Sequence, residues 1–360
     1  CDYLEATGDL ALLDEPVAWR DDSDFAQTDR HDRIRVHVDK LLATVRDRFV
    51  SGTHLLRYGE GDWNDSLQPV DPAMRDRMVS AWTVALLFQQ IGRYAAILGR
   101  AGREAASREL KALADGIRAD FHRYLVRDGV VAGYALFPVG GGEPELLLHP
   151  SDRRTGVRYS LIPITRALIA GLFDGPTAER HIAIIREHLL FPDGVRLMDR
   201  PIAYHGGPME LFRRAESAAY FGREIGLMYT HAHLRDAEAM AAVGDAEAVW
   251  RALMLVNPIA VTDLLPHAAL RQRNAYFSSS DAAFPDRYAA SDEWERVKAG
   301  TIRVEGGWRI YSSGPGIYLN LLVRTVFGRR RWYGERRGRP LLPASRAGLQ
   351  LIGIPKEPIA

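Results

Sequence analysis

The segment from Gly59 to Ser66 carries the side chains best suited to chemistry in this chain of 360 residues. Between Glu60 and Asp65 it gathers three carboxylates, an amide and an indole: Glu60, Asp62, Trp63, Asn64 and Asp65. A sugar site uses this mixture, because carboxylates and amides bind hydroxyls, an aromatic face covers the apolar ring face, and one carboxylic acid protonates a leaving oxygen. Asp and Asn also form turns in which they cap their own backbone. Composition alone leaves both interpretations open.

Two further segments are suited to holding an anion. The stretch Ser312-Ser313-Gly314-Pro315-Gly316 opens an expected helix, where free N–H groups and the positive end of the helix dipole face a ligand. An N-cap with a flexible glycine turn explains this stretch at least as well. The second segment brings Thr230, His231, His233 and Arg235 to one expected helix start. A lone histidine there is usually structural, but the clustering favours a binding role.

The elements that must position these residues are mostly helical, because apolar residues repeat at helix spacing. Asp71-Pro72 gives an N-cap with proline at the first helical position. Two short stretches, 130–135 and 349–352, are candidate strands, and the long loops are 50–72, 138–157, 191–210, 262–300 and 303–315. We expect helices over residues 30–49, from Asp71-Pro72 through Leu98, 104–126, 160–171, 176–190, 229–243, 246–255 and 316–326.

This order of helix, long loop and helix predicts an all-α helical barrel or toroid whose loops build a site at one end. Strand and helix do not alternate regularly, which argues against a parallel α/β sheet. After residue 328 the chain is rich in proline and loses its helical period. We therefore expect a catalytic domain over residues 1–327 and a C-terminal extension over 328–360 that folds back on it.

Charge and composition exclude several classes of protein. The formal net charge is +1 with 26% charged residues, so no field favours nucleic acid or an anionic membrane. No apolar run reaches the roughly 18–20 residues that span a bilayer, and no signal segment is evident. We interpret the one basic cluster as a solvated surface; it comprises Arg329, Arg330, Arg331, Arg336, Arg337 and Arg339.

Cys1 is the sole cysteine, which excludes a disulfide framework and a cysteine-rich metal site and fits a cytoplasmic setting. A mature lipoprotein would also begin with cysteine. However, residues 2–9 have the pattern of a helix end closed by a glycine C-cap at Gly8. We therefore expect a chain cut inside a domain.

The run Asp62-Trp63-Asn64-Asp65 resembles the Asp-Trp-Asn-Asp motif of glycoside hydrolase family 94, the cellobiose and chitobiose phosphorylases and their relatives. The resemblance implies an (α/α)6 barrel with Asp65 as general acid. Tyr229 to Ala232 matches the family's Tyr-Thr-His-Ala motif, which implies that His231 contacts phosphate. The family's Thr-Gly phosphate loop corresponds to Ser312-Ser313-Gly314, and the departure from its usual pattern leaves open which hydroxyl binds.

The resemblance also implies the remaining site residues. Glu224 matches a glutamate that contacts the acceptor sugar, and Arg196, Arg271 and Arg287 could hold phosphate or an acidic acceptor, or instead form packing ion pairs. Phosphate contacts are predicted from His231, Ser312, Ser313 and Gly314, with no metal and no cofactor beyond inorganic phosphate as co-substrate. Substrate contacts are predicted from Asp62, Trp63, Asn64, Glu224, Arg271 and Gln272.

The implied reaction is inverting phosphorolysis of a β-glucan, in which Asp65 protonates the glycosidic oxygen and phosphate attacks the anomeric carbon to give α-glucose 1-phosphate. Strings such as Phe191 to Met198 resemble the phosphorylases of β-1,2-linked oligoglucans most, with those of cellobionic acid next and cellobiose phosphorylase as a further alternative. An inverting hydrolase would use Asp65 as acid and Glu224 or another carboxylate as base. A non-catalytic carbohydrate-binding module would turn nothing over.

The expected partners are a β-glucan oligosaccharide and phosphate, without nucleic acid or membrane. The family's relatives are commonly dimers, so a homodimer is possible. In the family the barrel begins upstream of the residue that matches Cys1, and that part supplies contacts to the glycone sugar. The sequence leaves open whether this chain is active by itself.

Overall fold

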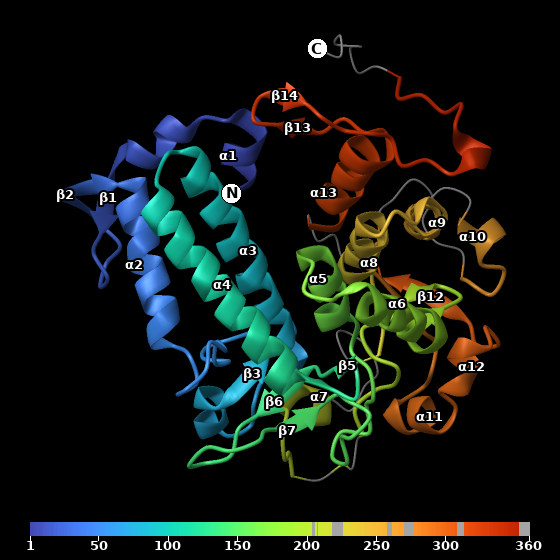
Figure 1. Ribbon diagram of the computed structural model, residues 1–360. Coiled ribbons are helices and arrows are strands. Elements are labelled where there is room, and N and C mark those ends of the chain that lie inside the picture. Colours follow the sequence, from blue (N-terminus) through green and yellow to red (C-terminus); the bar gives the residue numbers. More distant parts are fainter. Residues whose placement is uncertain are drawn as a thin grey trace.

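Helices are the main regular elements of the computed structural model, which describes residues 1–203, 206, 208–217, 226–257, 261–269, 277–307 and 313–352 (Figure 1). The α-helices are α1 Asp2–Thr7, α2 Ile34–Asp47, α3 Ala81–Arg100, α4 Glu104–Leu125, α5 Leu161–Ala170, α6 Gly175–Ile184, α7 Arg213–Ser217, α8 Thr230–Ala242, α9 Ala246–Val256, α10 Val261–Leu264, α11 Arg287–Asp292, α12 Glu295–Lys298 and α13 Ser313–Asn320.

The strands are short, and every named pair of them in the described part of the chain is antiparallel. One three-stranded sheet has the order β3-β6-β7 and another β10-β11-β12, and the other sheets have two strands each. The strands are β1 Pro16–Arg20, β2 Gln27–Arg33, β3 Met78–Ser80, β4 Val126–Arg127, β5 Val130–Val131, β6 Tyr134–Leu136, β7 Glu145–Leu147, β8 Leu190–Phe191, β9 Gly194–Val195, β10 Met228–Tyr229, β11 Ser279–Ala282, β12 Val304–Gly307, β13 Arg331–Trp332 and β14 Glu335–Arg336.

Most predicted helices are confirmed within a few residues, because their apolar stripes are long and regular. α4 buries Leu110, Ile117 and Phe121, as its periodicity predicts. Two helices end in a π-helical turn, α6 at Ile185–Leu189 and α13 at Leu321–Val326. The predicted strand over 130–135 is confirmed as β5 and β6, whereas 349–352 forms no strand. The predicted loop 262–300 contains β11, α11 and α12 instead of irregular chain alone.

The start of α3 corrects the sequence prediction. Asp71 caps only a short 3-10 helix, η3 Pro72–Asp76, by accepting a hydrogen bond from the N–H of Ala73. β3 intervenes, and Ser80 then caps α3 itself by accepting from the N–H of Thr83. An N-cap fixes only the first turn after it, so pairing of Met78–Ser80 with β6 decides where the long helix begins.

α2 packs Val38 and Leu42 against the core, but its apolar stripe is covered only in part. None of its residues is buried, and Leu41 keeps 62% of its surface exposed. Residues 30–33 belong to the β1–β2 hairpin rather than to the helix. In Figure 1, α2 and this hairpin form one flank of the molecule. Periodicity specifies an apolar face, but only a neighbouring element buries it.

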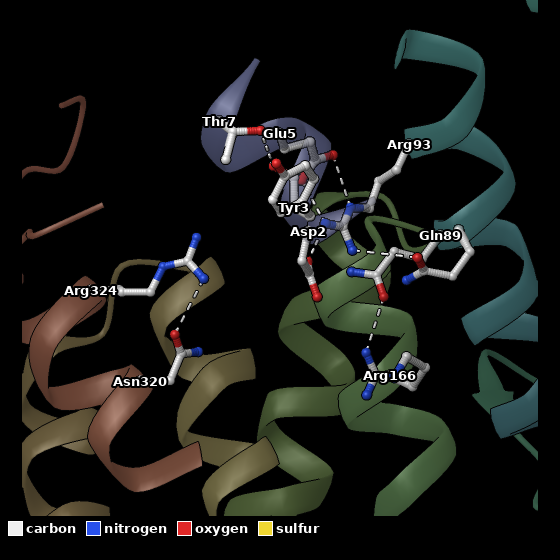
Figure 2. Close-up of polar contacts among 10 residues, drawn as sticks. Asp2, Tyr3, Glu5, Thr7, Gln89, Arg93, Arg166, Asn320 and Arg324 are labelled. Atoms are coloured by element: carbon white, nitrogen blue, oxygen red, sulfur yellow. Dashed lines mark hydrogen bonds and ion pairs between the residues drawn. The ribbon is translucent and has the colours of Figure 1, made fainter. Parts of the chain in front are cut away.

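α1 ends at Gly8, whose φ of 75° gives the glycine C-cap that the sequence predicts. Figure 2 shows Asp2 and Glu5 of α1 directed at Arg93 of α3, whose Nε donates to Glu5 Oε1 at 2.9 Å. The β13–β14 hairpin turns back onto the same helix, where the N–H of Gly334 donates to the carbonyl of Ala6 at 3.0 Å. This contact agrees with an extension that folds back, while the division at residues 327 and 328 stays a prediction.

α3, α5 and α8 start at the same end of the molecule, and this common start positions the candidate site. The loop before α3 is bonded to Thr83 in the first turn of α3 and contacts His231 in the first turn of α8. The segment around β9 connects α8 with α5. The N–H of Val195 donates to the ring of His233 on α8, and the carbonyl of Leu197 accepts from the N–H of Leu161, the first residue of α5. α3 packs on α5, α5 on α8, and α8 on α13.

No helix within the described ranges is long and apolar enough to cross a membrane.

Candidate active site

Asp62 anchors the loop that carries the acidic motif. Its Oδ2 accepts a hydrogen bond from the Tyr134 hydroxyl at 2.8 Å, and its Oδ1 accepts from Thr83 Oγ1 at 3.2 Å and from the N–H of Trp63 at 2.6 Å. Burial raises the pKa of Asp62, while hydrogen bonds from Tyr134 and Ser80 oppose that rise. The carboxylate thus ties the loop to β6 and α3. Its predicted contact with sugar stays a prediction.

The sequence left open whether the polar residues of this loop cap its backbone or face a ligand, and Asn64 and Asp65 differ in this respect. Asn64 is buried at 2% exposure, and its Oδ1 accepts from the N–H of Ser66 at 3.0 Å, which caps the 3-10 helix η2 Asp65–Leu67. Asp65 is the first residue of that helix and is exposed. The capping interpretation therefore holds for Asn64, while the carboxylate of Asp65 remains accessible for proton transfer.

Trp63 joins this loop to the start of α8. Its ring lies 5.4 Å from the His231 ring and 5.6 Å from the Tyr229 ring, both edge to face. The structure thereby brings the acidic motif and the predicted phosphate histidine together, although they are far apart in the sequence. Aromatic edge-to-face pairs at such separations are favourable and hold both rings in a defined orientation.

His231 is neutral at physiological pH. Partial burial, and after it the positive charges of Arg235 and Arg166, together lower its pKa from 6.5 to about 4. A neutral imidazole carries one donor and one acceptor nitrogen. His231 can therefore hydrogen-bond an oxyanion without contributing a positive charge.

Two other members of the α8 cluster, Thr230 and His233, have structural roles. Thr230 Oγ1 donates to the carbonyl of Phe277 at 3.1 Å. His233 is 1% exposed, and its ring nitrogens contact the carbonyl of Ala252 at 2.9 Å and the N–H of Val195 at 3.2 Å. Its neighbour Gly194, with φ of 127°, lies so close that a Cβ there would come within 2.9 Å of the imidazole.

The predicted phosphate loop lies at the start of α13, which packs on α8. Ser313 is exposed and Gly314 is buried. No hydrogen bond between two described residues joins Ser313 to His231, so their joint role stays a prediction. Four predicted site residues lie outside the described residues: Glu224, Arg271, Gln272 and Ser312.

Arg196 and Arg287 take the packing role that the sequence left as an alternative. Arg196 is fully buried and forms an ion pair with Asp193 at 2.6 Å, and it donates to the carbonyl of Gly226. Arg287 is 1% exposed and donates to the carbonyls of Ala215 and Ile202. Arg271 lies outside the described residues.

The structure adds residues that the sequence did not single out. The buried Tyr58 lies near the loop, where burial and the negative charges of Asp62 and Asp65 raise its pKa, and its hydroxyl has no partner among the described residues. Tyr134 sits among apolar strand residues, and Arg166 lies inside an otherwise apolar helix. A polar residue within a buried stripe was the only available signal for either.

The structure thus sets the loop with the exposed Asp65 beside a histidine in the first turn of a helix. The chain belongs to the glycosyl hydrolase 94 superfamily, whose catalytic-domain profile matches residues 1–279. It is 46% identical over 349 residues to a 1,2-beta-oligoglucan phosphorylase of Listeria innocua serovar 6a (strain ATCC BAA-680 / CLIP 11262). That match covers 97% of this chain and 32% of the relative, so the chain spans about a third of the relative's length.

A solved structure of a sialidase is similar in fold, with a TM-score of 0.51 at 12% sequence identity. The similarity covers 86% of this chain and 26% of the sialidase. At this level of identity the likeness concerns the arrangement of the helices alone.

The anchoring of Asp62 predicts different effects for two tyrosines. Tyr134→Phe removes a donor to a buried carboxylate and should lower the free energy of unfolding by about 1.5–3 kcal/mol. Tyr58→Phe makes the same change at a hydroxyl without a described partner and should alter it by less than about 0.5 kcal/mol. Urea unfolding followed by circular dichroism measures both. Equal losses in the two variants would contradict an anchoring role for the Tyr134 hydroxyl.

The lowered pKa of His231 predicts a defined pH dependence. Its imidazole should titrate near pH 4 in the folded protein and near 6.5 after unfolding. The unfolded chain then binds more protons between these values, so the stability present above pH 6.5 is lost as the pH falls toward 4. NMR titration of the ring resonance, assigned with His231→Gln, measures the pKa. A midpoint between pH 6 and 7 in the folded protein would show that burial and the charges of Arg235 and Arg166 do not lower the pKa of this ring.

Proposed function

We propose that the protein containing this chain catalyses inverting phosphorolysis of a β-glucan, releasing α-glucose 1-phosphate. The observation that supports this most directly is the Trp63–His231 contact, because it sets a proton-donor loop beside a neutral anion-binding histidine. The reaction needs inorganic phosphate as its co-substrate. The 46% identity to a relative named 1,2-beta-oligoglucan phosphorylase supports β-1,2-linked oligoglucan as the substrate.

In this mechanism Asp65 donates its proton to the glycosidic oxygen while phosphate attacks the anomeric carbon from the opposite face. One in-line displacement inverts the configuration, so a β-linkage gives an α-phosphate. An inverting hydrolase needs a second carboxylate as base to activate water. Phosphate is itself the nucleophile, so an acid and an anion site suffice. The exposed position of Asp65 and the neutral state of His231 are both compatible with these roles.

The (α/α)6 barrel is the fold that we propose for the complete catalytic domain. Three helices that start at one end support it, together with the packing of α4 along α3 and of α9 along α8. In Figure 1, α4 runs alongside α3 at the left, and α5 and α8 stand together to the right of centre. Such a barrel places its loops at one end, where Asp65, Trp63 and His231 would face the substrate.

The substrate assay separates phosphorolysis from hydrolysis. The full-length gene product is incubated with β-1,2-, β-1,4- and β-1,3-linked oligoglucans, with and without phosphate, and α-glucose 1-phosphate is measured enzymatically. We expect release only with phosphate and fastest from the β-1,2-linked substrate. Reducing sugar released at the same rate without phosphate would identify a hydrolase. Binding of glucan without any product would identify a non-catalytic module.

The acid assignment predicts the effect of Asp65→Asn. This variant cannot donate the proton, so kcat should fall by about 10²–10⁴-fold while the affinity for glucan stays within about threefold. Asp76→Asn is the matched control, because Asp76 is an exposed carboxylate paired with Arg57. Steady-state kinetics with the preferred glucan measures both variants. Near-normal turnover of Asp65→Asn would refute the assignment.

A further inference from the structure

A buried arginine on α5, the helix between α3 and α8, forms no ion pair with a carboxylate in the described part of the chain. Arg166 of α5 is 9% exposed, and its Nη1 donates to the side-chain amide oxygen of Gln89 on α3 at 3.0 Å (Figure 2). Its Nε has no partner, and no carboxylate in the described part of the chain comes within ion-pair distance of it. Buried charges in proteins are normally paired, because desolvation is costly. An unneutralised buried guanidinium therefore indicates a site for an anion.

Arg235 of α8 adds a second guanidinium to the same place. α5 packs on α8, and burial together with the positive charge of Arg235 lowers the pKa of Arg166. Arg235 Nη1 donates to Glu238 Oε2 at 2.5 Å, and its Nε has no partner among the described residues. Two cations and one carboxylate leave an excess of one positive charge.

Both arginines lie at the same depth below the start of their helices. Arg166 follows Leu161, the first residue of α5, by five positions, and Arg235 follows Thr230, the first residue of α8, by the same number. Five positions correspond to about 7.5 Å along a helix. His231 precedes Arg235 by four residues and therefore lies on the same face of α8, one turn closer to the loop of Trp63.

We propose that Arg166 and Arg235 form the inner wall of the phosphate site and supply the positive charge that it needs. The inference rests on the proposed function, which assigns phosphate as the nucleophile. A neutral imidazole, serine hydroxyls and a helix start provide only dipoles, whereas phosphate carries one to two negative charges at neutral pH. Guanidinium groups match the geometry of phosphate oxygens and stay charged when buried.

The arrangement also gives Glu238 a role. Its carboxylate holds Arg235 and opposes the cationic charge, and it raises the pKa of Arg166. Removing that negative charge should strengthen anion binding, whereas removing either arginine should weaken it. A role in packing alone would not produce opposite effects of these changes on one affinity.

The test is isothermal titration calorimetry of the full-length gene product with inorganic phosphate, and with gluconate as a carboxylate of similar charge. Arg166→Met and Arg235→Met should each weaken phosphate binding about 10- to 100-fold. Glu238→Gln should strengthen it severalfold. Arg46→Met is the control, because Arg46 pairs with Glu109 on the surface, and it should leave the affinity unchanged. The affinity for glucan should be the same in all four variants.

The inference would be overturned if Arg166→Met and Arg235→Met both fold and bind phosphate with unchanged affinity. It would also be overturned if these substitutions weaken the binding of gluconate but not that of phosphate. If the methionine variants do not fold, Glu238→Gln and Arg166→Lys decide. The site is supported if Glu238→Gln binds phosphate more tightly and Arg166→Lys loses less than tenfold in phosphate affinity. It is overturned if Glu238→Gln binds phosphate with unchanged or lower affinity. If the protein binds phosphate through these arginines but releases no α-glucose 1-phosphate, only the proposed reaction is refuted. If it catalyses phosphorolysis and the arginine variants keep the same phosphate affinity, only this inference is refuted.

Discussion

The packing of the Trp63 indole against the His231 imidazole is the contact on which the site depends. The loop of Trp63 leads into α3, and His231 stands in the first turn of α8, so the contact connects two helices that start at the same end. A displacement of either helix would separate the acidic loop from His231, for which we propose a phosphate contact. The fold therefore serves the site chiefly by keeping α3, α5 and α8 in register at their starts.

Two ionisable side chains of this region, Asp62 and Arg166, have neutral hydrogen-bond partners. Asp62 is held by the hydroxyls of Tyr134 and Thr83, and Arg166 is held by the amide of Gln89, so neutral partners satisfy both. Asp62 thereby fixes the loop that carries Trp63 and Asp65, and the positive charge of Arg166 acts on His231. Elsewhere the chain pairs its charges directly, as Arg93 does with Glu5.

Membership of the glycosyl hydrolase 94 superfamily agrees with this arrangement, but the match covers only part of a relative's length. The chain spans about a third of the phosphorylase that it resembles, and the matching profile covers residues 1–279. The described part of the chain holds the loop with Asp65, the Trp63–His231 contact and the two arginines that we propose for the phosphate site. Residues after 279 add the start of α13, which packs on α8, and the β13–β14 hairpin, which bonds to α1.

Local patterns in the sequence determined the helices, the glycine cap at Gly8 and the motif around Asp65, because periodicity, capping and motif chemistry depend on near neighbours. The sequence could not decide that Asp71 caps only a short turn, that Leu41 stays exposed, or that 349–352 forms no strand, since each depends on what packs against it. Only the tertiary structure separated His231 from the structural His233, and the burial of Arg166 beside Arg235 likewise arises from the packing of α5 on α8. Charge and burial at these positions are set by residues distant in the chain, which no local pattern encodes.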